Sequence, residues 1–231
     1  MIKPSLPVLL SVNGGYVDAA GYLALQGLFT SHVTGNFVTL GAALVLGSSG
    51  VVAKLLALPM FCTVVFATRL LSLALPALGL PALRALLGLK VLLLSVGAYL
   101  AIALGPFHSG DGWQALVTGM TLVAAMAIQN AIHRMHMAST SPTTIMTGNT
   151  TQVMLDLADL TRRLSAEARI AAKARLRRMS ASIAAFAAGC ASAALLYAYQ
   201  GDWCFLVPPL VGLYTLLVRE SAPAGAEGDF T

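Results

Sequence analysis

The chain has 231 residues, of which 58% are hydrophobic and only 10% are charged, and its mean hydropathy is +0.81. An ordinary soluble domain carries about 25% charged residues, which it needs to cover its surface. This composition excludes a soluble globular protein and predicts an integral membrane protein, because lipid solvates apolar side chains. The net charge of +5 does not indicate a nucleic-acid partner, because the basic stretch contains no aromatic residues.

Six segments are long and apolar enough to cross a bilayer as helices, which takes about 20 residues each. In chain order they are residues 6–29, 55–75, 86–105, 113–132, 179–199 and 205–218. We therefore expect an all-α integral membrane protein with six transmembrane helices. The first segment follows a lysine as a signal peptide would, but no good cleavage site comes after it, and we expect it to be retained.

Two further segments, 33–47 and 145–160, are ambiguous. The first is apolar but short, and the second contains Gln152 and two aspartates, which are too polar to face lipid. If neither segment crosses and the N-terminus is cytoplasmic, every Lys and Arg except Lys54 falls on or near the cytoplasmic side. The positive-inside rule therefore favours six spans plus two short broken or re-entrant helical segments, with both termini in the cytoplasm.

The two halves of the chain, 1–110 and 111–220, each contain three predicted spans and one ambiguous segment. Three is an odd number, so the second half enters the membrane from the opposite side. This layout predicts a 3+3 inverted repeat within a single membrane domain of residues 1–231. We expect the first ambiguous segment at the outer face, the second at the inner face, and a flexible tail over residues 221–231.

The ambiguous segments share the tripeptide Thr-Gly-Asn near their starts, as Thr34-Gly35-Asn36 and as Thr147-Gly148-Asn149. A shared tripeptide is common by chance, but both copies follow a span that contains polar residues. Non-helical backbone inside a membrane needs hydrogen bonds, which Thr and Asn supply while Gly accepts unusual dihedral angles. Alternatively, Thr and Asn cap ordinary helices and Gly permits close packing.

Polar residues within the predicted spans are the other candidates. Asp18 lies mid-span, where an ionised carboxylate is costly unless it is paired, hydrated or protonated. The functional interpretation is that Asp18 carries a proton, binds a cation or anchors a substrate. The structural interpretation is that it holds two helices together by a hydrogen bond. Gln129 and Asn130 are open to the same functional and structural interpretations. We predict a substrate site made of ten residues: Asn13, Asp18, Thr34, Gly35, Asn36, Gln129, Asn130, Thr147, Gly148 and Asn149.

Other patterns indicate structure rather than chemistry. The three cysteines have no metal or redox spacing and are interpreted as small apolar residues. Small residues at four-residue spacing predict a close-packing helix face, within the chain or between two chains; they are Ala181, Ala185, Gly189 and Ala193. The basic, amphipathic stretch 162–178 predicts a cytoplasmic connector that lies on anionic lipid. We find no catalytic motif, and we expect no cofactor and no metal.

Four runs of residues carry a family resemblance: GGYVDAAGY at 14–22, FTSHVTGN at 29–36, IQNA at 128–131 and MTGNT at 146–150. They resemble the YoaK family, also called DUF1275, whose members are bacterial multi-pass membrane proteins of about this length. The resemblance covers nearly the whole chain and implies a bacterial inner-membrane protein of undefined function, often guessed to be a transporter. It carries over no substrate and no catalytic residue.

Our leading hypothesis is a secondary transporter or permease for a small molecule or ion, with its site near mid-membrane. We expect the chain to lie in the lipid bilayer and to bind no nucleic acid. The sequence does not decide whether it forms a homodimer. The alternative is a non-transporting membrane protein that acts as a scaffold, an assembly factor or a regulator. An enzyme is not expected, because no nucleophile is paired with a base.

Overall fold

The structure is a computed structural model that describes residues 5–217, and over these residues it is all helical, without a strand. The helices in chain order are α1 (Leu6–Ala24), α2 (Asn36–Leu46), α3 (Val51–Ala74), α4 (Ala82–Leu104), α5 (Trp113–His136), α6 (Met146–Leu160), α7 (Ala166–Gln200) and α8 (Val207–Leu217). Three short 3-10 helices join them: η1 (Val33–Gly35), η2 (Leu75–Leu78) and η3 (Gly201–Leu206). The all-α prediction is confirmed, and the predicted tail 221–231 lies outside the described residues.

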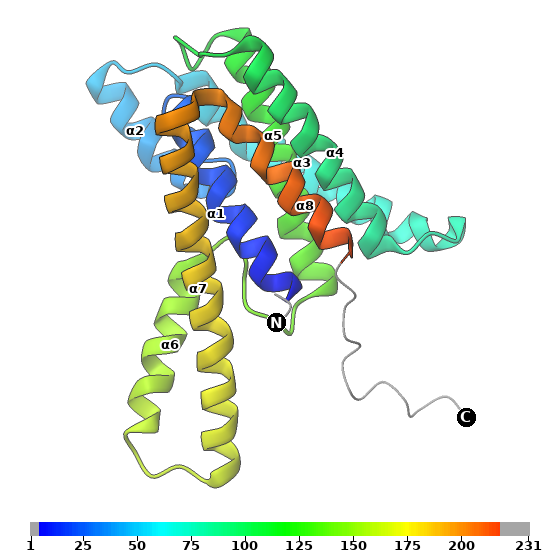
Figure 1. Cartoon of the computed structure of the whole chain (residues 1–231), viewed down its shortest axis with the longest axis vertical. Helices are drawn as coiled ribbons and strands as arrows, with labels where there is room; N and C mark the ends of the chain where they lie inside the picture. Colours follow the sequence, from blue (N-terminus) through cyan, green and yellow to red (C-terminus); the bar gives the residue numbers. More distant parts are fainter. Residues whose placement is uncertain (1–4, 218–231) are drawn as a thin grey trace.

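Four helical segments are long and apolar enough to span a membrane: Val51–Leu78, Ala82–Leu104, Trp113–His136 and Ala166–Leu217. The last of these contains α7, η3 and α8, so it holds both of the final two predicted spans in one continuous helical run. The helix α1 is not among the four, because Asn13 and Asp18 lower its hydropathy. It packs instead against α5, α7 and α8 (Figure 1). Asn13 donates a hydrogen bond to a backbone oxygen of α8, and Asp18 is bonded to the loop that follows α1, so both find polar partners that lipid lacks.

The two halves of the chain are interleaved in the bundle. The helix α1 runs along α7 from the second half, and α5 packs against α3 and α4 from the first half. The main apolar core forms between them and includes Tyr16 and Val17 of α1, Leu94 of α4, Met126 of α5 and Phe205 of η3. Asn13 and Asp18 of α1 and Gln129 of α5 are therefore held inside protein.

The helices α1 and α7 approach each other closely at two glycines. A Cβ atom on Gly15 would lie 2.2 Å from a backbone oxygen of α7, and one on Gly189 would lie 2.2 Å from a backbone oxygen of α1. Ala185 and Ala193 are buried on the same side of α7, whereas Ala181 is exposed. The predicted close-packing face is confirmed for these buried positions, and its partner is α1 of the same chain.

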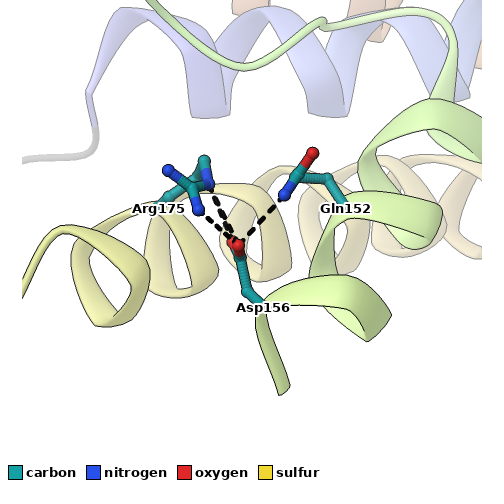
Figure 2. A network of polar contacts seen from close by, with 3 residues as sticks. All are labelled: Gln152, Asp156 and Arg175. Atoms are coloured by element: carbon teal, nitrogen blue, oxygen red, sulfur yellow. Dashed lines mark hydrogen bonds and ion pairs between the residues drawn. The ribbon is translucent and has the colours of Figure 1, made fainter. Parts of the chain in front are cut away.

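The helix α6 and the first half of α7 form an antiparallel hairpin that projects beyond the bundle (Figure 1). The 35 residues of α7 make a helix about 52 Å long, well over the ~30 Å thickness of a bilayer core. Figure 2 shows the contact that ties the hairpin: Arg175 pairs with Asp156 at 2.5 Å, and Gln152 donates to the same carboxylate at 3.0 Å. The Arg175 hydrogen bonds hold the pKa of Asp156 below its usual value.

A carboxylate from a distant loop caps α3. The two oxygens of Asp111 accept hydrogen bonds at 2.8–3.2 Å from the backbone N–H groups at the start of that helix, those of the capping residue Gly50 and of Val51, Val52 and Ala53. The Nζ of Lys54 donates to the carbonyl oxygens of Gln26 and Ser49 at 2.9 and 3.1 Å. These bonds fix one end of the bundle, where the loops before α2, α3 and α5 meet.

Candidate functional site

The chain turns back into the bundle after α1. The helix ends at Ala24, and the following loop returns to Asp18, which lies six residues before that end, or about 9 Å deeper. The Oδ1 of Asp18 accepts hydrogen bonds from the backbone N–H groups of Thr30 and Ser31 at 2.8 Å and of His32 at 3.3 Å. Asp18 therefore satisfies backbone groups that lipid could not.

The chain makes the same return after α5. This helix ends at His136, and Asn130 lies six residues before that end. The Oγ1 of Thr144 donates to the Oδ1 of Asn130 at 2.7 Å, and the Nε2 of Gln129 donates to the Oγ1 of Thr143 at 3.2 Å. Side-chain amides thus hold the second returning loop where a carboxylate holds the first.

The asparagine of each Thr-Gly-Asn motif closes its loop onto a carbonyl group seven residues earlier. The Nδ2 of Asn36 donates to the oxygen of Phe29 at 2.8 Å, and the Nδ2 of Asn149 donates to the oxygen of Pro142 at 2.9 Å. The N–H of Phe29 also donates back to Asn36 at 2.9 Å. Proline has no N–H, so the second loop has only one of these two bonds.

The other residues of the two motifs differ in their surroundings. Thr34 lines a hollow, and Gly35 stands so close to two aromatic rings that a Cβ there would lie 3.0 and 3.1 Å from them. Thr147 and Gly148 are exposed, and a Cβ on Gly148 would meet no atom within 4 Å. Asn149 is the buried residue of the second motif.

A hollow of about 140 Å³ lies where the two returning loops meet. Eight residues line it: Ser31, His32, Val33 and Thr34 from the first loop and η1, Leu58 and Phe61 from α3, Asn130 from α5, and Ile145 immediately before α6. Its size suits an ion or a very small solute, since cavities for larger ligands measure about 300–1,000 Å³. Both halves of the chain thus contribute polar groups to one small space.

The ten predicted site residues fall into four groups. Thr34 and Asn130 line the hollow. Asp18 lies behind it and holds two of the lining residues in place. Asn13 and Gln129 belong to a separate buried cluster, and the other five shape the loops or lie at the surface. No group of three or more His, Cys, Asp or Glu side chains within residues 5–217 is placed to hold a metal, and all three cysteines are free.

Sequence reasoning missed Lys90, which it placed on or near the cytoplasmic side. Lys90 is the ninth residue of α4, about 12 Å along the helix, and it is completely buried. Its Nζ donates to the Oε1 of Gln129 at 2.5 Å, and the Nε2 of Gln129 also donates to the carbonyl oxygen of Leu10 at 2.8 Å. Its position inside an apolar run was the signal that could have identified it, because lysine there is rare.

The comparison with protein families matches residues 6–218 to the family described as "Protein of unknown function (DUF1275)". The chain belongs to this family, so the resemblance seen in the sequence is confirmed. No curated protein matches the chain, and no solved structure matches it.

Proposed function

We propose that this member of the DUF1275 family is a secondary transporter or permease for a small solute, which binds in the hollow between the two returning loops. One observation carries the proposal: polar groups from both halves of an apolar bundle converge on that hollow. Polar groups inside a membrane are expensive and mark the paths of ions and solutes. Non-helical backbone at membrane depth is tolerated where it lines a cavity or lies inside protein.

We propose a six-span, 3+3 inverted repeat as the framework of transport. Asp18 and Asn130 each lie six residues before a helix end and hold a returning loop. Asn36 and Asn149 each bind a carbonyl seven residues earlier. The helices α2 and α6 then leave toward opposite ends of the bundle (Figure 1). These parallels support two related halves, which can rock against each other around a fixed site.

We propose that both termini face the cytoplasm of a bacterial inner membrane. The start of α1 and the hairpin of α6 and α7 lie toward the same end of the bundle (Figure 1). That hairpin carries an excess of basic residues, namely Arg162, Arg163, Arg169, Lys173, Arg175, Arg177 and Arg178. Basic residues near the ends of spans accumulate on the cytoplasmic side.

Two measurements test binding in the hollow. A panel of small solutes is first screened on the purified full chain, because a ligand that binds only the folded state raises the apparent Tm. The variant Thr34→Val then removes one hydroxyl from the hollow, while Thr150→Val removes an exposed hydroxyl of α6 as the matched control. We expect the first variant alone to weaken the response. An equal response of both variants and the unmodified chain would place binding elsewhere.

A non-transporting scaffold or regulator is the second candidate. It is favoured by the projecting hairpin, where Met154, Leu155 and Leu157 are 55%, 55% and 43% exposed. Labelling of Asn130→Cys by a water-soluble maleimide, in a variant without the three native cysteines, separates the two functions. A transport path admits water, so the transporter is labelled at this position, whereas a scaffold with a closed interior is not.

A further inference from the structure

Two lysines are buried in the described part of the chain, and they are bound very differently. Lys54 donates to two backbone carbonyl oxygens at one end of the bundle. Lys90 lies within α4 and makes one hydrogen bond, to the side-chain oxygen of Gln129. An ammonium group has three N–H donors. Within residues 5–217, two donors of Lys90 therefore have no acceptor.

An ammonium group at Lys90 would also lack an opposite charge. The one ion pair within residues 5–217 joins Asp156 and Arg175 on the hairpin. Asp18, the buried acid of the bundle, accepts its hydrogen bonds from the backbone of its own loop. A buried charge without a partner is strongly unfavourable in an apolar interior. Lys90 is thus a site at which an anion would be stabilised.

Asn13 adds a second incompletely bonded group to the same region. Its Nδ2 donates to a backbone oxygen of α8 at 3.2 Å, but its buried Oδ1 has no hydrogen-bond partner. A Cβ on Gly14 would lie 3.4 Å from the Nε2 of Gln129, and one on Gly212 would lie 3.8 Å from the Nδ2 of Asn13. The nearest atoms to the same two Cβ positions are the backbone oxygen of Thr143 at 2.8 Å and a methyl carbon of Val91 at 2.9 Å. The two glycines therefore allow close packing around a buried polar cluster of Asn13, Lys90 and Gln129.

This cluster is connected to the hollow through α5. Gln129 and Asn130 are consecutive residues; the first binds Lys90 and the second lines the hollow. The next loop holds both amides, since Thr143 binds Gln129 and Thr144 binds Asn130. A movement of this loop relative to α5 would change the hollow and the bond to Lys90 together.

We propose that the transported solute is a small anion and that Lys90 binds it after Gln129 releases the ammonium group. An ammonium is a compact point charge that suits a halide, a carboxylate or a phosphate. The second N–H of the Asn13 amide donates to the anion, whereas both N–H groups of Gln129 are already bonded to Leu10 and Thr143. This inference rests on the proposed function, because it names the class of solute that the hollow admits.

The test measures anion binding to the purified full chain in lipid nanodiscs. Potassium chloride, acetate, succinate, phosphate and sulfate are titrated at constant ionic strength, and the apparent Tm is followed. At least one anion should raise the Tm in a saturable way, because it binds only the folded state. Lys90→Met should abolish this rise. Lys173→Met is the matched control, because it removes an exposed lysine of the hairpin, and it should keep the full response.

A second variant keeps the test decisive if Lys90→Met does not fold. Gln129→Glu places a carboxylate where the amide oxygen now meets Lys90, so it should raise the Tm and abolish the anion response. The proposal is overturned if no anion gives a saturable rise, or if either variant responds like the unmodified chain. A response that depends on Lys90 but comes without flux in vesicles would refute transport and leave the anion site standing.

Discussion

The carboxylate of Asp18 accepts a 2.8 Å hydrogen bond from the backbone N–H of Ser31, thirteen residues later in the chain. This bond brings the loop after α1 back to the middle of the helix, where Ser31 becomes part of the wall of the hollow. Asp18 therefore shapes the site whether or not it also contacts a solute. The functional and the structural interpretation of this residue are compatible.

The first prediction separates the hydrogen bonds of Asp18 from its charge. Asp18→Ala leaves three backbone N–H groups without their acceptor and should lower the free energy of unfolding by about 2–4 kcal/mol. Asp18→Asn keeps one oxygen that can accept these bonds and should lose much less. Equilibrium unfolding in mixed micelles measures both. Equal losses in the two variants would show that the negative charge, rather than the acceptor, holds the loop.

The second prediction concerns the contact between α1 and α7. Gly15→Ala places a Cβ 2.2 Å from a backbone oxygen, so the helices must separate, and we expect a loss of about 1–3 kcal/mol. Gly41→Ala in α2 is the matched control, since a Cβ there meets nothing within 4 Å. It should be neutral or stabilising by up to about 1 kcal/mol, because alanine favours helix. Thermal unfolding of the two variants checks the difference, and a neutral Gly15→Ala would refute the close approach.

The third prediction concerns the capping of α3 by Asp111. Asp111→Ala removes the acceptor of four N–H groups and should cost about 0.5–2 kcal/mol, the range for the loss of a helix cap. The same change at the exposed Asp159 of the hairpin removes one negative charge without removing a cap. Hydrogen exchange should become faster in residues 50–54 only for Asp111→Ala. Unchanged protection there would mean that α3 begins without this cap.

The fourth prediction is a dependence of hairpin stability on pH. The pKa of Asp156 is lowered in the folded state by Arg175, so the pair contributes stability above the unfolded pKa of about 3.9. That contribution is lost as the pH falls through the lower, folded pKa. Arg175 is 39% exposed, so the pair is worth only about 0.2–1 kcal/mol. The protection factors of the α6 amides, which correct for the pH dependence of intrinsic exchange, should fall in acid for the unmodified chain and should not fall for Asp156→Asn, which lacks this titration.

The parts of the fold that could be predicted are those that depend only on the length of an apolar segment. The segments predicted at 33–47 and 145–160 correspond to Val33–Leu46 and Met146–Leu160, because Thr-Gly-Asn marks both starts. The first predicted span extended to residue 29, but α1 ends at Ala24. The residues after Ala24 mix apolar and polar side chains, so their sequence does not show where the helix ends. The hydrogen bonds from Thr30, Ser31 and His32 to Asp18 show that this loop turns back into the bundle. The six spans and the inverted repeat remain proposals.

The site was harder to predict, because its contacts join residues far apart in the chain. The positive-inside rule assigns lysines near the ends of spans to the cytoplasmic side, and on that basis we expected Lys90 to lie near the cytoplasm. Its burial depends on Gln129, 39 residues away, and no local pattern reveals that bond. Likewise, the two Thr-Gly-Asn copies look equivalent in sequence and both threonines are exposed, yet only Thr34 lines the hollow.

The most direct test of the transport proposal is solute flux in proteoliposomes that contain the full chain or its Asp18→Ala variant, which loses the bonds that hold Ser31 and His32 in the wall of the hollow. Transport through the hollow predicts saturable uptake by the unmodified chain and uptake by the variant that falls to the level of empty vesicles. Uptake by the unmodified chain that is no faster than that of empty vesicles, for every solute that raises its Tm, would contradict transport. Equal uptake by the two proteins would show that Asp18 and the hollow are not the site.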